Sequence, residues 1–367
     1  MQSWYTIDNI NTIDSPALIV YPQRIKENIR LLVKMAGDAS LLRPHVKTHK
    51  MAEVSRLLLE AGITKFKCAT IAEAEMLALV GAPDVLIAHQ PAGPKTERLL
   101  QLTTAFPNTC FSCMIDNPET AAAVAGHFLK AGKKIQAFID LNTGMNRSGI
   151  LPEKALQLFK DCQLLDGLVI VGLHAYDGHI RDTSLEERNK KSDAAFAEVD
   201  WLLKKLAELT DTKFQVVVGG SPSFPTHTRR KNVQYSPGTF VFWDWGYKHL
   251  VPDEPFDYAA LVITRIISVI DKETVCTDLG HKAVAAENPL PRVHFLNAPD
   301  AIPVAQSEEH LVVKVPAGNT YKVGDVWYGV PVHICPTVAL YQEAAVVENH
   351  QVTAYWNVIA RNRRITL

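Results

Sequence analysis

The chain has 367 residues, which predicts two domains or one barrel-sized domain with an appendage, because a domain spans about 150 residues. Hydrophobic residues make up 47% of the chain and charged residues 21%, so it can bury a large core, and extensive disorder is excluded. The 38 basic and 39 acidic residues leave a formal net charge of -1, which excludes a dedicated nucleic-acid-binding protein of the usual basic kind.

The sequence carries neither a recognisable membrane segment nor a sorting signal. No apolar run reaches the roughly 18 residues that a membrane span needs, and residues 1–20 lack a basic stretch followed by an apolar one. The six cysteines are scattered, as is typical of proteins in a reducing compartment. Cys110 and Cys113 form a CxxC, but no second CxxC completes a zinc site, so we interpret both as core residues. We therefore expect a cytoplasmic protein that does not contact a membrane.

Short apolar runs alternate with helical patterns up to about residue 240, as is typical of repeated βα units. Helical patterns between the runs end at residues such as Gly62 and Gly81. Eight strands can close a barrel, and the GxGxxG turn of an open doubly wound sheet is absent. We predict an α/β fold with a (β/α)8 TIM-type barrel over residues 15–250. The eight candidate runs are 41–47, 65–69, 85–89, 110–115, 135–141, 168–176, 214–220 and 233–238.

From about Asp257 the helical periods disappear and strand-like runs follow one another, divided by Gly, Pro, Asn and Asp. This pattern predicts a second, mostly β domain over residues 251–367, with residues 1–14 packed against it. The runs are 260–270, 274–280, 310–315, 324–338 and 351–361.

The segment 43–50, RPHVKTHK, is the strongest candidate for part of an active site. On a strand, alternation places Arg43, His45 and Lys47 on one face. A lysine among other cations loses its proton more readily, and its amine can then form a Schiff base with an aldehyde. The alternative is a solvent-exposed basic loop, but the end of a first barrel strand is where active sites of this fold lie.

Two glycine clusters follow the seventh and eighth runs. Gly220 and Ser221 leave the seventh, and Gly238 and Thr239 leave the eighth. Small residues let backbone N–H groups approach phosphate oxygens, and barrels often bind phosphate after these two strands. Either cluster alone would indicate only a turn.

Two further loops carry candidates. Arg147 lies in a glycine-bounded loop after the fifth run, where its guanidinium could bind an anionic oxygen, although a surface turn is the alternative. Tyr176 and His179 follow the sixth run; the tyrosine could contact an aromatic ring and the histidine could transfer protons, but packing explains either residue equally well.

His333 and Cys335 are candidate metal ligands. On a strand they would point the same way, and imidazole with thiolate suits zinc. Two ligands do not make a complete site unless substrate or water fills the remaining positions.

Seven motifs taken together resemble the family of D-threonine aldolase and D-serine dehydratase, and the resemblance spans residues 15–361. It implies pyridoxal-phosphate enzymes of fold type III, with an alanine-racemase-like barrel and a β domain. The motifs, in chain order, are RPHVKTHK, DLNTGMNRSG, GLHAYDGH, VVGGSPS, SPGTF, TDLGHK and HICPTV.

The resemblance also implies roles for the candidate residues. Lys47 would be the catalytic lysine that carries the cofactor, Arg147 would lie near the phenolic oxygen of the cofactor, and Tyr176 would lie beside its ring. His333 and Cys335 would bind a divalent metal that also contacts the β-hydroxyl group of the substrate. The phosphate would be held by Gly220, Ser221, Gly238 and Thr239.

By the same resemblance the substrate is a small β-hydroxy D-amino acid and the protein is a homodimer. Cys335 stands where the aldolases typically carry aspartate and the dehydratases cysteine, which favours zinc over Mn or Mg and favours elimination to a keto acid and ammonia. The surrounding PxHICPTVxLY instead resembles aldolase relatives, which cleave to glycine and an aldehyde. The sequence leaves the reaction type open, with His179 as one candidate proton acceptor. An amino-acid racemase and a non-catalytic pyridoxal-phosphate-binding protein remain as alternatives.

Overall fold

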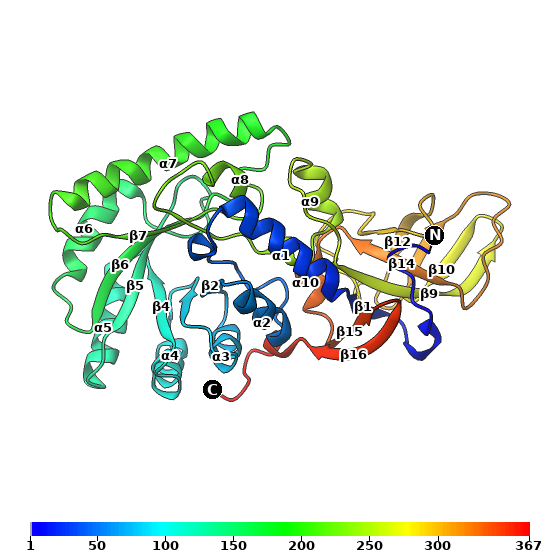
Figure 1. Ribbon diagram of the computed structural model, residues 1–367, viewed down its shortest axis with the longest axis horizontal. Coiled ribbons are helices and arrows are strands. Elements are labelled where there is room, and N and C mark those ends of the chain that lie inside the picture. Colours follow the sequence, from blue (N-terminus) through cyan, green and yellow to red (C-terminus); the bar gives the residue numbers. More distant parts are fainter. Residues whose placement is uncertain (1) are drawn as a thin grey trace. The chain divides into compact units, whose positions relative to one another are not determined.

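The computed structural model describes residues 2–367, which divide into two compact units (Figure 1). The barrel unit comprises Leu32–Lys47, Ser55–Gly238 and Asn362–Leu367. The β unit comprises the residues up to Leu31 together with Thr48–Val54 and Thr239–Arg361. Helices α1 (Pro22–Ala36) and α2 (Ala52–Glu60) each contribute residues to both units.

The barrel unit contains a curved sheet of seven parallel strands in chain order, with a helix after each of the first six (Figure 1). Strands covered on both faces read as nearly continuous apolar runs, which is why the sequence signalled them clearly. The strands are β2 (Lys65–Cys68), β3 (Asp84–Ile87), β4 (Cys110–Ile115), β5 (Ile135–Leu141), β6 (Leu168–Ala175), β7 (Gln215–Val218) and β8 (Gln234–Tyr235). The helices are α3 (Ile71–Leu79), α4 (Pro94–Ala105), α5 (Pro118–Lys130), α6 (Pro152–Cys162), α7 (Leu185–Ala207) and α8 (Phe224–His227), and a 3-10 turn, η2 (Ala39–Leu41), precedes the strands.

Local sequence sets the ends of these helices. The side chain of Thr70 accepts a hydrogen bond from the backbone N–H of Glu73 and so caps α3. Asn117 caps α5 in the same way, and Pro118 occupies its first turn, where the missing N–H costs nothing. Gly62 ends the turn after α2 with a φ of +84°, a conformation that favours glycine.

Residues 42–46 fill the eighth position of the barrel without forming a full strand. Leu42 bridges Tyr235 of β8, and His45 bridges Lys67 of β2, both in parallel. Pro44 has no N–H to donate, so the ladder is reduced to these single bridges. The prediction of an α/β barrel with a mostly β second part is confirmed, with the difference that seven strands form the ladder and this segment stands in for the first.

The β unit is built on a nine-stranded, mostly antiparallel sheet in which β1 pairs with β9 and β15. Ile7 and Ile13 from the N-terminal segment pack in one apolar cluster with Leu261, Ile263 and Tyr328. The strands are β1 (Ala17–Val20), β9 (Ala260–Asp271), β10 (Thr274–Thr277), β11 (Val293–Phe295), β12 (Ile302–Gln306), β13 (Leu311–Lys314), β14 (Val326–Pro331), β15 (Glu343–Glu348) and β16 (Gln351–Asn357). The helical segments are η1 (Ile10–Thr12), η3 (Thr239–Val241), α9 (Trp245–Leu250), α10 (Ile334–Val338) and η4 (Ile359–Arg361).

The run 324–338 was predicted as one strand, and this prediction is wrong in its second half. Strand β14 ends at Pro331, and the short helix α10 begins after His333. The carboxylate of Asp244 accepts a hydrogen bond from the backbone N–H of Ile334, and the Thr337 hydroxyl donates to the His333 carbonyl. These bonds satisfy the ends of a helical turn, in which His333 and Cys335 no longer share a strand face.

None of the helices within residues 2–367 combines the length and the apolar character needed to span a bilayer.

Candidate active site

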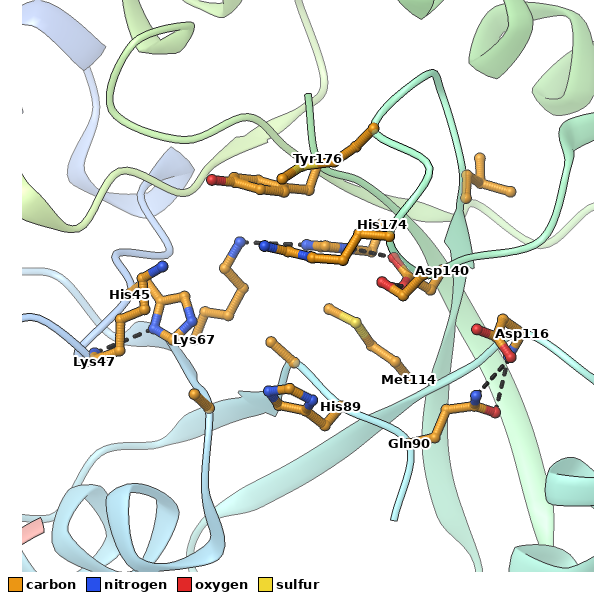
Figure 2. Close-up of a pocket in the computed structure, with 16 residues that line it drawn as sticks. His45, Lys47, Lys67, His89, Gln90, Met114, Asp116, Asp140, His174 and Tyr176 are labelled. Atoms are coloured by element: carbon orange, nitrogen blue, oxygen red, sulfur yellow. Dashed lines mark hydrogen bonds and ion pairs between the residues drawn. The ribbon is translucent and has the colours of Figure 1, made fainter. Parts of the chain in front are cut away.

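A cavity of about 520 Å³ lies in the barrel unit, lined by the segment 45–47 and by the carboxyl ends of β2 to β6 (Figure 2). This is the face at which barrels build their active sites. Three cationic side chains, Lys47, Lys67 and Arg147, line it together with the carboxyl groups of Asp116 and Asp140.

Arg43 and His45 lie on the segment that fills the eighth barrel position, whereas Lys47 lies in the turn that follows it and not on a strand as the sequence predicted. Arg43 is fully buried and donates two hydrogen bonds to Asp84, with N···O distances of 2.6 and 2.9 Å, and a third to Gln234 at 2.7 Å. His45 and Lys47 line the cavity, and the Lys47 backbone N–H donates to Nδ1 of His45 at 3.2 Å. Arg43 is therefore part of the barrel interior, His45 is half-buried, and Lys47 is exposed but lines the cavity.

Arg147 and Tyr176 lie together at the cavity wall. The guanidinium carbon of Arg147 is 5.1 Å from the centre of the Tyr176 ring, a cation–π distance. Arg147 lies in the loop 142–149. Within this loop the Asn142 side chain accepts hydrogen bonds from the backbone N–H groups of Gly144 and Asn146, and the Gly149 N–H donates to Asp116 at 3.1 Å. These bonds anchor the loop to the edge of the cavity.

The glycine loop after β7 approaches the same ring. A Cβ added at Gly220 would lie 2.8 Å from the ring of Tyr176, so only glycine fits there without displacement. The Ser221 hydroxyl accepts a hydrogen bond from the Gly238 N–H at 3.3 Å. The structure thus brings Gly220, Ser221 and Gly238 together in the barrel unit, whereas Thr239 begins the segment that belongs to the β unit.

A buried hydrogen-bond network holds the backbone of this glycine loop. The Gly220 N–H donates to the Ser223 hydroxyl at 3.2 Å, and that hydroxyl donates to Asp177 at 2.5 Å. The second carboxylate oxygen of Asp177 lies 2.8 Å from Nε2 of His227. Burial alone would raise the pKa of Asp177, but the charge and hydrogen bond of His227 hold that pKa below its ordinary value. Sequence reasoning did not identify this network.

Sequence reasoning also missed a row of three side chains inside the cavity. Nζ of Lys67 lies 3.3 Å from Nε2 of His174, and Nδ1 of His174 lies 2.7 Å from the Asp140 carboxylate (Figure 2). The Ser148 hydroxyl donates to the other oxygen of Asp140 at 3.1 Å. Because Nδ1 of the neutral imidazole donates to the carboxylate, Nε2 accepts a hydrogen bond from Lys67.

The ionisation of this row is strongly perturbed. Burial, together with the charges of Lys47 and other cations, lowers the pKa of Lys67 to about 7. Burial and the charge of Lys67 lower the pKa of His174 below its ordinary value. Burial would raise the pKa of Asp140, but its hydrogen bonds with His174 and Ser148, together with the nearby positive charges, hold that pKa below its ordinary value. One signal was available in the sequence: a lysine in the middle of the buried run KFKCA is rare unless it has a partner or a task.

His179, the candidate proton acceptor, lies outside the cavity. It is exposed and sits against Gly144, where an added Cβ would lie 2.9 Å from its Nε2 atom. It is not among the residues that line the cavity.

His333 and Cys335 lie in the β unit. Nδ1 of His333 is 2.5 Å from the Glu287 carboxylate, and the Cys335 sulfur is 3.1 Å from the Thr48 hydroxyl and 3.5 Å from the Thr239 hydroxyl. Burial alone would lower the pKa of His333, but its hydrogen bond with Cys335 and the nearby carboxylates raise it to about 9.

A metal site of three or more His, Cys, Asp or Glu side chains is not found within residues 2–367. The two predicted ligands would therefore need partners from substrate or water.

Comparison with known proteins covers nearly the whole chain. Residues 20–243 match the family model described as "Alanine racemase, N-terminal domain", and residues 259–347 match the one described as "Putative serine dehydratase domain". The chain is 25% identical over 361 residues to a D-threonine aldolase of Arthrobacter sp., covering 96% of this chain and 94% of that protein. It is 28% identical over 368 residues to a 3-hydroxy-D-aspartate aldolase of Paracoccus denitrificans (strain Pd 1222), covering 96% and 93%. The crystal structure of D-threonine aldolase from Filomicrobium marinum matches with a TM-score of 0.87 and 26% identity over 95% of this chain and 96% of that one.

Proposed function

The chain belongs to the family of the alanine racemase N-terminal domain, and on this premise we propose that it is a pyridoxal-phosphate-dependent lyase that acts on β-hydroxy D-amino acids. The observation that carries the proposal is the barrel cavity, which Lys47 and Arg147 line together. Two relatives that match over 96% of the chain, at 25% and 28% identity, are named as aldolases of D-threonine and 3-hydroxy-D-aspartate, and a D-serine dehydratase of Dictyostelium discoideum matches over 93% at a lower identity of 21%. The reaction we propose is therefore retro-aldol cleavage to glycine and an aldehyde.

The residues at the cavity fit pyridoxal phosphate. The volume of about 520 Å³ is in the range of small-molecule sites, and a nucleophilic amine and a guanidinium line it. The cradle at Gly220, which a Cβ would fill, suits the close approach of backbone to a phosphate. Lys47 would hold the cofactor covalently, Arg147 would bind its phenolic oxygen and Tyr176 would flank its ring. Gly220, Ser221, Gly238 and Thr239 would hold its phosphate.

When bound, pyridoxal phosphate supplies an electron sink for negative charge that develops at Cα of the substrate. The chain's own residues orient and shield that chemistry. Arg147 holds a fixed positive charge at the cavity wall, 5.1 Å from the Tyr176 ring. The anchored loop 142–149 keeps this charge in place without a reorganisation cost at the moment of reaction.

We further propose that His333 and Cys335 hold a divalent metal, with zinc favoured because imidazole and thiolate are its preferred ligands. The carboxylate of Glu287 on Nδ1 of His333 supports this proposal, since metal-binding histidines commonly donate their second ring nitrogen to a carboxylate. The metal would supply a Lewis acid for the β-oxygen of the substrate.

Elimination of water is the second candidate reaction. The match of residues 259–347 to a serine dehydratase domain favours it, as does the cysteine at position 335. Both reactions start from the same bound substrate, and they differ in whether the β-hydroxyl loses a proton or leaves as water.

The deciding assay incubates the purified protein with pyridoxal phosphate, zinc or manganese, and one substrate at a time. Glycine and acetaldehyde from D-threonine support the aldolase, and pyruvate and ammonia from D-serine support the dehydratase. Exchange of the Cα hydrogen without either product pair supports a racemase, and binding of the cofactor without turnover of any D-amino acid supports a non-catalytic protein. Turnover of the L-isomers alone contradicts the stereochemical assignment.

Lys47→Ala provides the matched control for the cofactor. We expect it to abolish the visible absorbance of the bound cofactor. If the absorbance persists, a different lysine carries the cofactor, and Lys67 is then the first to examine because it lines the same cavity.

We also expect a cytoplasmic homodimer, the dimer on the strength of the family resemblance. Sedimentation of the purified protein tests the oligomeric state.

A further inference from the structure

Building on the proposed function, we propose that Lys67 is the catalytic residue that accepts and returns the proton moved in the reaction, and that His174 and Asp140 are the positioning residues that hold its amine. The proposal rests on the placement of a buried amine in the cavity, at the end of a continuous line of hydrogen bonds (Figure 2).

The retro-aldol reaction needs such a group. The O–H bond of the β-hydroxyl breaks and its electron pair forms the carbonyl of the aldehyde, while the pair of the Cα–Cβ bond passes to Cα. The proton lost from oxygen equals the proton that Cα gains in glycine. A single amine that takes up one proton and gives it back therefore balances the reaction, with no other acid or base consumed.

The position of Lys67 suits this task. Its side chain is 2% exposed, and Nζ points into the cavity 5.5 Å from the centre of the Tyr176 ring (Figure 2). The hydrogen bond from Nζ to His174 uses one donor of the amine, and the bond from His174 to Asp140 keeps the imidazole ring in orientation. The remaining bonds of Nζ are available to a ligand, because a lysine ammonium has three donors.

The charges around Lys67 bring the free energies of its ammonium form and its neutral amine form close together near neutral pH. Lys47, Arg43 and Arg147 disfavour the ammonium form, and Asp140 favours it. With burial added, the pKa falls to about 7, where proton exchange near neutral pH is most efficient.

A lysine in a pocket can transfer a proton, or it can bind an anion. Substitution by arginine distinguishes these two roles. Arginine retains the positive charge but does not release its proton. An anion-binding residue would thus be rescued by Lys67→Arg, whereas a proton-transferring residue would not.

The experiment compares wild type with Lys67→Met, Lys67→Arg and, as the matched control, Lys65→Met. Lys65 lies two residues earlier on the same strand and donates to the Ser40 carbonyl at 3.1 Å, outside the cavity. We expect both Lys67 variants to lose about 10²- to 10⁴-fold in kcat for retro-aldol cleavage, the range for a lost general acid or base. The control should keep the wild-type rate.

A spectroscopic readout accompanies the rates. With pyridoxal phosphate bound and no substrate present, the visible absorbance of wild type should change with pH as Lys67 in the same cavity gains or loses its proton. This titration should vanish in both Lys67 variants and persist in Lys65→Met. Asp140→Asn removes the charge that favours the ammonium form, so the midpoint should move to lower pH, a shift that a purely structural role of Asp140 would not produce.

The outcomes separate the two proposals. Absence of lyase turnover in wild type overturns the proposed function and with it the role of Lys67. Turnover by wild type that survives in Lys67→Met, or that Lys67→Arg restores, overturns the role of Lys67 alone. An absorbance titration that is unchanged in Lys67→Met also overturns it.

Discussion

The buried amine of Lys67 should make the stability of the protein depend on pH, even without a cofactor. The pKa falls from an ordinary 10.5 to about 7 in the folded chain. A shift of roughly 3.5 pKa units at about 1.36 kcal/mol each corresponds to about 5 kcal/mol of destabilisation at neutral and lower pH. Methionine carries no charge, so Lys67→Met should raise the free energy of unfolding at neutral and lower pH. The loss of the hydrogen bond to His174 should reduce this gain by about 1 kcal/mol.

The sign of the pH dependence follows from proton binding. Between about pH 7 and 10.5 the unfolded chain keeps the proton of Lys67 and the folded chain has lost it, so this group makes the wild type more stable as pH rises. The advantage of Lys67→Met should therefore be largest at or below about pH 7. It should shrink by about 1.4 kcal/mol per pH unit above that.

Urea unfolding of the cofactor-free proteins, followed from about pH 6 to about pH 9, measures this difference. Lys65→Met serves as the control and should show a difference from wild type that does not change with pH. If the difference between wild type and Lys67→Met is also constant across this range, the amine is not held in an unfavourable charged state and the reasoning from burial and neighbouring cations is refuted.

Three further outcomes are expected. Arg43→Met removes the buried guanidinium that pairs with Asp84 and should lower the free energy of unfolding by about 3–5 kcal/mol in urea titrations; a loss below about 1 kcal/mol would contradict this. Gly220→Ala places a Cβ 2.8 Å from a tyrosine ring and should weaken pyridoxal-phosphate binding about tenfold or more in absorbance titrations, and unchanged affinity would argue against a phosphate cradle there. Glu287→Gln weakens the support of His333 and should reduce zinc affinity about 10- to 100-fold by competition with a chelator, whereas equal affinity would remove the glutamate from the proposed site.

Much of the fold followed from local pattern. Every strand from β2 to β8 was predicted at its place, because strands buried on both faces carry continuous apolar runs and the helices between them end at recognisable residues. The short strands β1, β11, β12 and β15 were missed, since three to six residues are too few to establish a period. The helical turn after His333 was missed because it depends on Asp244, far away in the chain.

Some residues of the candidate site could likewise be predicted from local sequence, and others could not. Lys47, Arg147, Tyr176 and Gly220 could be proposed from motifs, because each lies in a short segment whose composition is unusual by itself. Lys67 gave only one signal, a lysine within the apolar run KFKCA, and its role could not be proposed because its partners His174 and Asp140 come from other strands.

The order of residues alone determined the βα repeat, the change to β structure after about residue 257 and the loops at which chemistry could gather, since periodicity and turn residues act over a few positions. Folding decided which of those loops share a cavity and which buried groups meet. The amine of Lys67 reaches a histidine 107 positions away, and that histidine reaches a carboxylate 34 positions away. A pKa is set by burial and by charges within a few ångströms, and those distances exist only once the strands have come together.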